Sequence, residues 1–80
     1  MKLTVKFFAR YREAVGMDGL AIEGDFATLD DVRARLAQWK GFDVLAEQNL
    51  MCARNEELCS LDEPLSDGDE VAFFPTVTGG

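Results

Sequence analysis

The chain has 80 residues, of which 48% are hydrophobic and 29% are charged, and 15 acidic against 8 basic side chains give it a net charge of −7. This length suits one small domain with a single core, and the apolar content excludes a disordered chain. The acidic balance argues against nucleic acid and anionic membranes as partners, because their phosphates repel such a surface. A negative surface suits docking to basic protein faces. It is equally well explained as a charge that keeps a small domain soluble.

No apolar stretch approaches the roughly 18 residues that span a bilayer, and the first residues lack the apolar run of a signal peptide. We therefore expect a cytoplasmic protein. The chain has two cysteines and no histidine that would complete a metal site with them. Neither Cys52 nor Cys59 has sequence neighbours that lower a thiol pKa, so we interpret both as reduced, partly buried thiols rather than as a redox or sulfur-relay pair.

The N-terminal third predicts two strands that flank a short helix. Residues 2–7 alternate polar and apolar, which is typical of a half-buried strand. Its core-facing residues are Leu3, Val5 and Phe7. Residues 8–15 fit one or two helical turns, closed by Gly16 where helices commonly end in a left-handed conformation. Alternation over 20–23 predicts a second strand, antiparallel to the first.

The main helix begins after Thr28, a good N-cap residue, with Asp31 three residues later as the reciprocal capping partner. Apolar residues then recur at helical spacing and predict one core-facing stripe that ends near Gly41. The members of that stripe are Leu29, Val32, Leu36 and Trp39. Residues 42–48 predict a further short helix.

The C-terminal third predicts short strands separated by turns. Residues 50–54 form one strand, 55–57 a turn and 58–60 the next extended segment. Residues 62–69 are dense in turn formers and include an Asp-Gly dipeptide. Residues 70–74 form the last strand. Its buried face carries Val71 and Phe73, which leaves Ala72 and Phe74 on the other side.

This order of elements predicts an α+β domain in which a mixed sheet packs on one main helix. It is the order of the β-grasp, or ubiquitin-like, fold, in which the first and last strands are central and parallel. We assign residues 1–74 to this domain and 75–80 to an extended C-terminal tail.

The tail ends in Thr78-Gly79-Gly80. Two glycines stabilise nothing at a terminus, because they bury no side chain and are costly to order. They can, however, pass through a channel too narrow for a Cβ and place a carboxylate inside a partner's active site. We therefore predict that the Gly80 carboxylate is the reactive group, and an inert frayed tail is the alternative.

Five segments together closely resemble the small subunits of molybdopterin synthase, which are ubiquitin-like sulfur carriers. They are Phe7-Phe8-Ala9, Arg12-Glu13, Val15-Gly16, the run 67–75 and the terminal run 77–80. The resemblance spans nearly the whole chain, and the terminal run is its most specific part. The family typically has a second proline where this chain has Thr76, so Pro75 alone fixes a backbone angle in the tail.

The resemblance implies a sequence of reactions at Gly80. An E1-like adenylating enzyme uses ATP and magnesium to form an acyl-adenylate, and sulfur from a cysteine desulfurase or rhodanese-type protein converts it to a thiocarboxylate. The tail then enters the large subunit of the synthase, where sulfur passes to cyclic pyranopterin monophosphate and forms the molybdopterin dithiolene. No permanently bound cofactor and no metal are implied, and two small and two large subunits are expected to form a heterotetramer.

The residues expected to contact the partner are Phe74, Pro75, Thr76, Val77, Thr78 and Gly79. If Phe74 is exposed, it is the first choice for a docking residue; the alternative is that it belongs to a second small core. The same two interpretations apply to Phe8. Other functions remain open: a sulfur carrier for thiazole synthesis, a protein modifier that forms isopeptide bonds, and a β-grasp interaction domain with an inert tail. The chain is not expected to be an enzyme on its own, because it lacks a recognisable set of catalytic residues.

Overall fold

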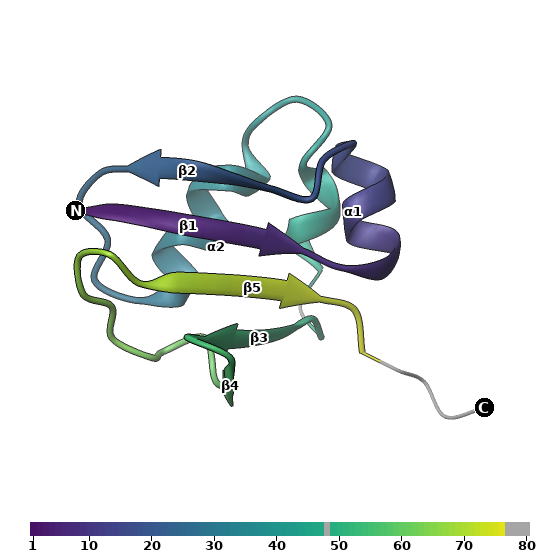
Figure 1. The fold of residues 1–80 in the computed structure, drawn as a ribbon. Coiled ribbons are helices and arrows are strands. Elements are labelled where there is room, and N and C mark those ends of the chain that lie inside the picture. The colour runs from purple at the N-terminus through teal and green to yellow at the C-terminus, as the bar shows by residue number, and fades with distance from the viewer. Residues whose placement is uncertain (48, 77–80) are drawn as a thin grey trace.

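A five-stranded mixed sheet has the helices of the domain against one of its faces (Figure 1). A computed structural model describes residues 1–47 and 49–76. In chain order the elements are β1 (Lys2–Phe7), α1 (Ala9–Val15), β2 (Gly19–Glu23), α2 (Leu29–Ala37), the 3-10 helix η1 (Asp43–Ala46), β3 (Met51–Arg54), β4 (Glu57–Cys59) and β5 (Glu70–Phe74). The strands lie in the order β2-β1-β5-β3-β4. The predicted β-grasp fold is confirmed.

The two strands nearest the ends of the chain are central in the sheet. β1 and β5 run parallel, with Val5 opposite Val71 and Phe7 opposite Phe73. All four side chains are at most 1% exposed, so the alternation predicted for both strands is confirmed. The remaining pairs, β1 with β2, β3 with β5 and β3 with β4, are antiparallel.

The end of α1 and the start of α2 lie where the sequence predicts them. α1 ends at Gly16, whose φ of 79° is left-handed and whose N–H donates to the Arg12 carbonyl at 2.9 Å. At the start of α2, the Asp31 carboxylate accepts the backbone N–H groups of Ala27 and Thr28 at 2.8 and 3.1 Å. These bonds hold the two residues that precede the first turn of the helix, and so they fix where α2 begins.

The prediction that Trp39 belongs to the buried stripe of α2 is wrong. Leu29, Val32 and Leu36 are fully buried, but Trp39 is 41% exposed. The helix ends at Ala37, so Trp39 lies in the following turn and no longer obeys the helical period. Its ring packs edge-on against Phe42, with the centroids 5.4 Å apart.

The segment predicted as a short helix over 42–48 is a 3-10 helix of four residues, η1. Directly after it, Glu47 joins this segment to α1. Its carboxylate accepts two bonds from the Arg10 guanidinium at 2.7 Å each and one from the Tyr11 hydroxyl at 3.0 Å. Burial, together with the bond to Glu47, raises the pKa of Tyr11 to about 12.

Candidate docking face and the start of the tail

The face of the sheet opposite the helices carries a row of apolar side chains. Strand register places Ala72 between Lys6 and Ala53, and Leu58 opposite Ala53. Ala72 therefore lies on the predicted side of β5, although it is only 9% exposed because neighbouring strands flank its small side chain. We call the larger apolar side chains here the outer patch, defined as Phe8, Met51, Leu58 and Phe74.

Two of these side chains are unusually accessible for large hydrophobic residues. Phe8 is 46% exposed and Leu58 is 66% exposed. Phe74 is half-buried, stands opposite Met51 in the sheet, and packs edge-on against the Phe8 ring at 6.3 Å between centroids. Its immediate neighbour Phe73 is completely buried on the other face. The two rings are thus adjacent in sequence but face different environments, and the Phe74 ring is outside the main core.

Three members of the outer patch, Phe8, Met51 and Phe74, lie where the chain leaves the sheet. Phe74 is the last residue of β5, and the half-buried Pro75 and Thr76 follow it directly. β5 is held on both sides, by β1 and by β3, so the start of this segment is fixed by the centre of the sheet. The predicted tail residues Val77, Thr78, Gly79 and Gly80 lie outside the described residues, and their roles stay predictions, as does the division of the chain at Phe74.

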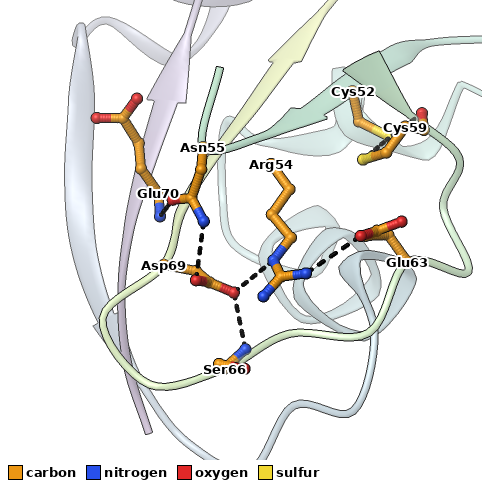
Figure 2. Close-up of polar contacts among 8 residues, drawn as sticks. All are labelled: Cys52, Arg54, Asn55, Cys59, Glu63, Ser66, Asp69 and Glu70. Carbon is orange, nitrogen blue, oxygen red and sulfur yellow. Dashed lines mark hydrogen bonds and ion pairs between the residues drawn. The ribbon is translucent and has the colours of Figure 1, made fainter. Parts of the chain in front are cut away.

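A buried carboxylate fixes the other end of β5, as Figure 2 shows. Asp69 is 7% exposed and accepts hydrogen bonds from Arg54 Nε at 2.7 Å, Asn55 Nδ2 at 3.0 Å and the Ser66 N–H at 2.7 Å. Burial works against its ionisation, but these bonds outweigh burial and hold the pKa of Asp69 below its ordinary value. Arg54 also reaches Glu63 at 3.2 Å. The network thereby joins the β3–β4 turn to the start of β5.

Neither a metal site nor a membrane-spanning helix is found in the part of the chain that the structure describes. Within residues 1–47 and 49–76, no group of three or more His, Cys, Asp or Glu side chains could hold a metal ion. Over the same residues, none of the helices is both long and apolar enough to cross a membrane. The ionic contacts of Asp69 and Glu47 join secondary-structure elements to one another.

The domain has close relatives along nearly its whole length. It is 46% identical over 80 residues to the molybdopterin synthase sulfur carrier subunit of Escherichia coli, covering 98% of this chain and 99% of that protein. The corresponding protein of Haemophilus influenzae is 47% identical over 81 residues, with the same coverage. Small archaeal modifier protein 3 of Haloferax volcanii is 31% identical over 93 residues, covering all of both chains.

Solved structures share the fold. Small archaeal modifier protein 1 of H. volcanii superimposes with a TM-score of 0.78 at 26% identity, over 95% of this chain and 98% of that one. The complex of subunits 1 and 2 of the molybdopterin-converting factor from Helicobacter pylori contains a chain with a TM-score of 0.70 at 28% identity, covering all of both chains.

These likenesses and the strand order define the class of protein as a ubiquitin-like β-grasp domain. The ThiS family model matches residues 5–80, and the chain belongs to this family. The resemblance to the small subunits of molybdopterin synthase, inferred above from sequence segments, is confirmed by the two bacterial relatives.

Proposed function

We propose that this chain is the sulfur-carrying small subunit of a molybdopterin synthase, and that Gly80 carries the sulfur. The observation that carries the proposal is the 46–47% identity, over nearly the full length, to two proteins named as sulfur carrier subunits of that complex. The match of the family model through residue 80 supports the inclusion of the Gly-Gly tail.

The proposed chemistry follows from the weakness of a carboxylate as an electrophile, because its negative charge repels nucleophiles. An E1-like enzyme first joins the Gly80 carboxylate to the AMP moiety of ATP and releases pyrophosphate. The terminal sulfur of a persulfide on a cysteine desulfurase or rhodanese-type donor then attacks the carbonyl carbon and displaces AMP, and a thiol reductant cleaves the S–S bond of the resulting acyl disulfide to release the thiocarboxylate. The resulting thiocarboxylate is an anionic, soft nucleophile, suited to deliver sulfur to cyclic pyranopterin monophosphate. We place these steps in the cytoplasm.

The body of the domain would position the tail. From Pro75 to Gly80, an extended chain reaches roughly 20 Å at about 3.3 to 3.6 Å per residue. The start of the tail is fixed by β5. A partner that binds the outer patch therefore also sets where the tail enters the partner's active site. We propose that the outer patch and Pro75 to Gly79 dock on the large subunit of the synthase, in a heterotetramer with two copies of each chain. The structure of the H. pylori complex of subunits 1 and 2 supports this pairing.

A protein modifier is the second candidate function, favoured by the likeness to the small archaeal modifier proteins. It would use the same activated Gly80 but transfer the carbonyl to a lysine amine. Lysine-linked adducts of this chain in cells would indicate that function. A carrier for thiazole synthesis would show the same activation of Gly80 but would not support molybdopterin formation.

The test is intact-mass analysis after incubation with a candidate activating enzyme, ATP and a sulfur source. We expect the mass change of one oxygen-to-sulfur exchange, localised to Gly80 by fragmentation. Absence of this change with an enzyme and donor that charge a known carrier would refute the proposal.

Two tail variants separate the reactive terminus from the fold. Deletion of Gly80, or one alanine added after it, should leave the melting temperature and the affinity for the large subunit almost unchanged, because β5 and the outer patch remain. Either variant should lose sulfur transfer, since the carboxylate is displaced by about one residue and catalytic geometry tolerates only about 1 Å of error. Molybdopterin formation at the parent rate by either variant would show that Gly80 does not bear the sulfur.

A further inference from the structure

The two cysteines face each other across the β3–β4 hairpin. Cys52 stands directly opposite Cys59, and their sulfur atoms are 4.0 Å apart (Figure 2). Directly opposed residues of antiparallel strands have Cα atoms about 4.5 or 5.5 Å apart, and both spacings lie within the ~4.4 to 6.8 Å range that disulfides bridge. Side-chain rotation would therefore bring the sulfurs into bonding distance without moving the strands.

The two thiols differ in access. Cys52 is 3% exposed and belongs to the core cluster, where its thiol donates to the Cys59 carbonyl at 3.2 Å. Cys59 is partly exposed and lines a surface hollow of about 360 Å³, together with Arg54, Asn55 and Glu63 among others. A small reagent can thus reach Cys59 from solvent, whereas Cys52 is nearly closed to solvent and does not line this hollow.

We propose that Cys52 and Cys59 form a reversible intramolecular disulfide, with Cys59 as the entry thiol and Cys52 as the resolving thiol. The oxidant is a small-molecule disulfide such as glutathione disulfide. Cys59 loses its proton and its sulfur attacks one sulfur of the oxidant, which gives a mixed disulfide and one released thiolate. Cys52 then loses its proton, attacks Cys59 Sγ and displaces the second thiolate. The released thiolates take up the two protons, so the protein loses two electrons and the oxidant gains them.

The surroundings of the pair make this a slow, inducible modification rather than fast redox catalysis. Burial raises the pKa of Cys52 to about 12 and also raises that of Cys59. Glu63 and Asp62 add to the rise at Cys59, whereas Arg54 opposes it. The attacking species is the thiolate, so the reaction should accelerate as the pH rises above neutral. The raised pKa values agree with reduced thiols as the resting state. The strand register adds a partner thiol that each cysteine can bond to under oxidation.

The disulfide would secure the edge of the sheet. β4 has three residues, Cys59 is the last of them, and within residues 1–47 and 49–76 this strand pairs only with β3. Its neighbour Leu58 is the most exposed member of the outer patch. A bond at Cys59 would hold β4 against β3 and with it fix the position of Leu58. Because the cross-link also restricts the unfolded chain, oxidation should raise the melting temperature.

The test uses the full chain, reduced and then exposed to glutathione disulfide at mildly alkaline pH. We expect the intact mass to fall by two hydrogen atoms, one peptide pair linked through Cys52 and Cys59, and full reversal by dithiothreitol. The melting temperature of the oxidised form should rise by about 5 to 15 °C. This outcome does not depend on the proposed function, because it requires neither the tail nor a partner.

Two variants test the assigned order. Cys52→Ala should accumulate a glutathione adduct at Cys59, whereas Cys59→Ala should leave Cys52 unmodified while folded. If Cys52→Ala fails to fold, a time course of the parent protein should show the Cys59 adduct before the cross-linked form. A stable adduct on the parent, a disulfide-linked dimer, a lowered melting temperature, or no reaction where a reference dithiol is oxidised would each overturn the proposal.

Discussion

Adjacent phenylalanines on opposite faces of β5 allow binding to be separated from folding. Phe73 is fully buried, whereas Phe74 is half-buried and packs on Phe8. Truncation of a fully buried Phe typically costs about 3 to 5 kcal/mol of stability. Phe74→Ala should cost only about 1 to 2 kcal/mol, because the ring loses part of its burial and an edge-on pair that contributes roughly 0.5 to 1.5 kcal/mol.

A milder change at Phe73 gives a control of matched stability. Phe73→Leu keeps an apolar side chain in the core and should also cost about 1 to 2 kcal/mol. The two variants should therefore unfold at similar denaturant concentrations. Only Phe74→Ala removes a ring from the outer patch, so only this variant should weaken binding to the large subunit, by about 1 to 3 kcal/mol or roughly 5- to 150-fold in Kd.

Urea unfolding of both variants gives the stability, and calorimetric titration with a purified large subunit gives the affinity. A loss of more than about 3 kcal/mol for Phe74→Ala with unchanged affinity would assign its ring to the core and refute docking through the outer patch. Equal loss of affinity in Phe73→Leu would show that the binding effect reflects destabilisation and not a lost contact.

Two further predictions follow from titrating groups. Asp69→Asn should cost about 2 to 3 kcal/mol at neutral pH, because the Arg54 guanidinium loses a charged partner. The ordinary pKa of this carboxyl is 3.8, and folding lowers it. The ionised carboxylate therefore stabilises the folded protein fully above pH 3.8, and this stabilisation is lost as the pH falls through the pKa of the folded state. In acid unfolding, the difference in stability between parent and variant should narrow over that range. Tyr11 behaves in the opposite sense: its pKa rises from 10.0 to about 12, so its contribution is present below pH 10 and is lost towards pH 12. Between pH 10 and pH 12, the unfolding midpoint should fall more steeply with pH for the parent than for Tyr11→Phe. Parallel curves of midpoint against pH would show that folding does not change the pKa of the hydroxyl.

Most of the fold could be predicted from the alternation of polar and apolar residues with a period of two. The segments 2–7 and 70–74 each place every second residue in the core, and their parallel pairing follows from the order of the elements. The capping signals at Thr28 and Asp31 located the start of α2. Its end was less predictable, because no residue before Gly41 marks a helix stop and Trp39 continues the apolar period past the last helical turn.

The pairing of Cys52 with Cys59 could not be predicted, because it depends on the exact length of the turn between β3 and β4. The predicted turn over 55–57 would have set Cys52 opposite Ser60. The observed turn has two residues, Asn55 and Glu56, with positive φ of 50° and 71°. Such turns usually place glycine at the second position, so glutamate there gives a weak signal. A shift of one residue exchanges the faces of a strand, and here it decides which side chain lies opposite Cys52.

The position of β5 sets the order in which the domain can assemble. The chain is synthesised from its N-terminus, yet β5, which is made after the other four strands, lies between β1 and β3. A nascent or truncated chain that stops before Glu70 has two incomplete pieces of sheet, each with an open edge that invites aggregation. Contacts between β1 and β5 close a long loop, which slows folding. The outer patch, which takes side chains from β3, β4 and β5, is therefore complete only in chains synthesised past β5.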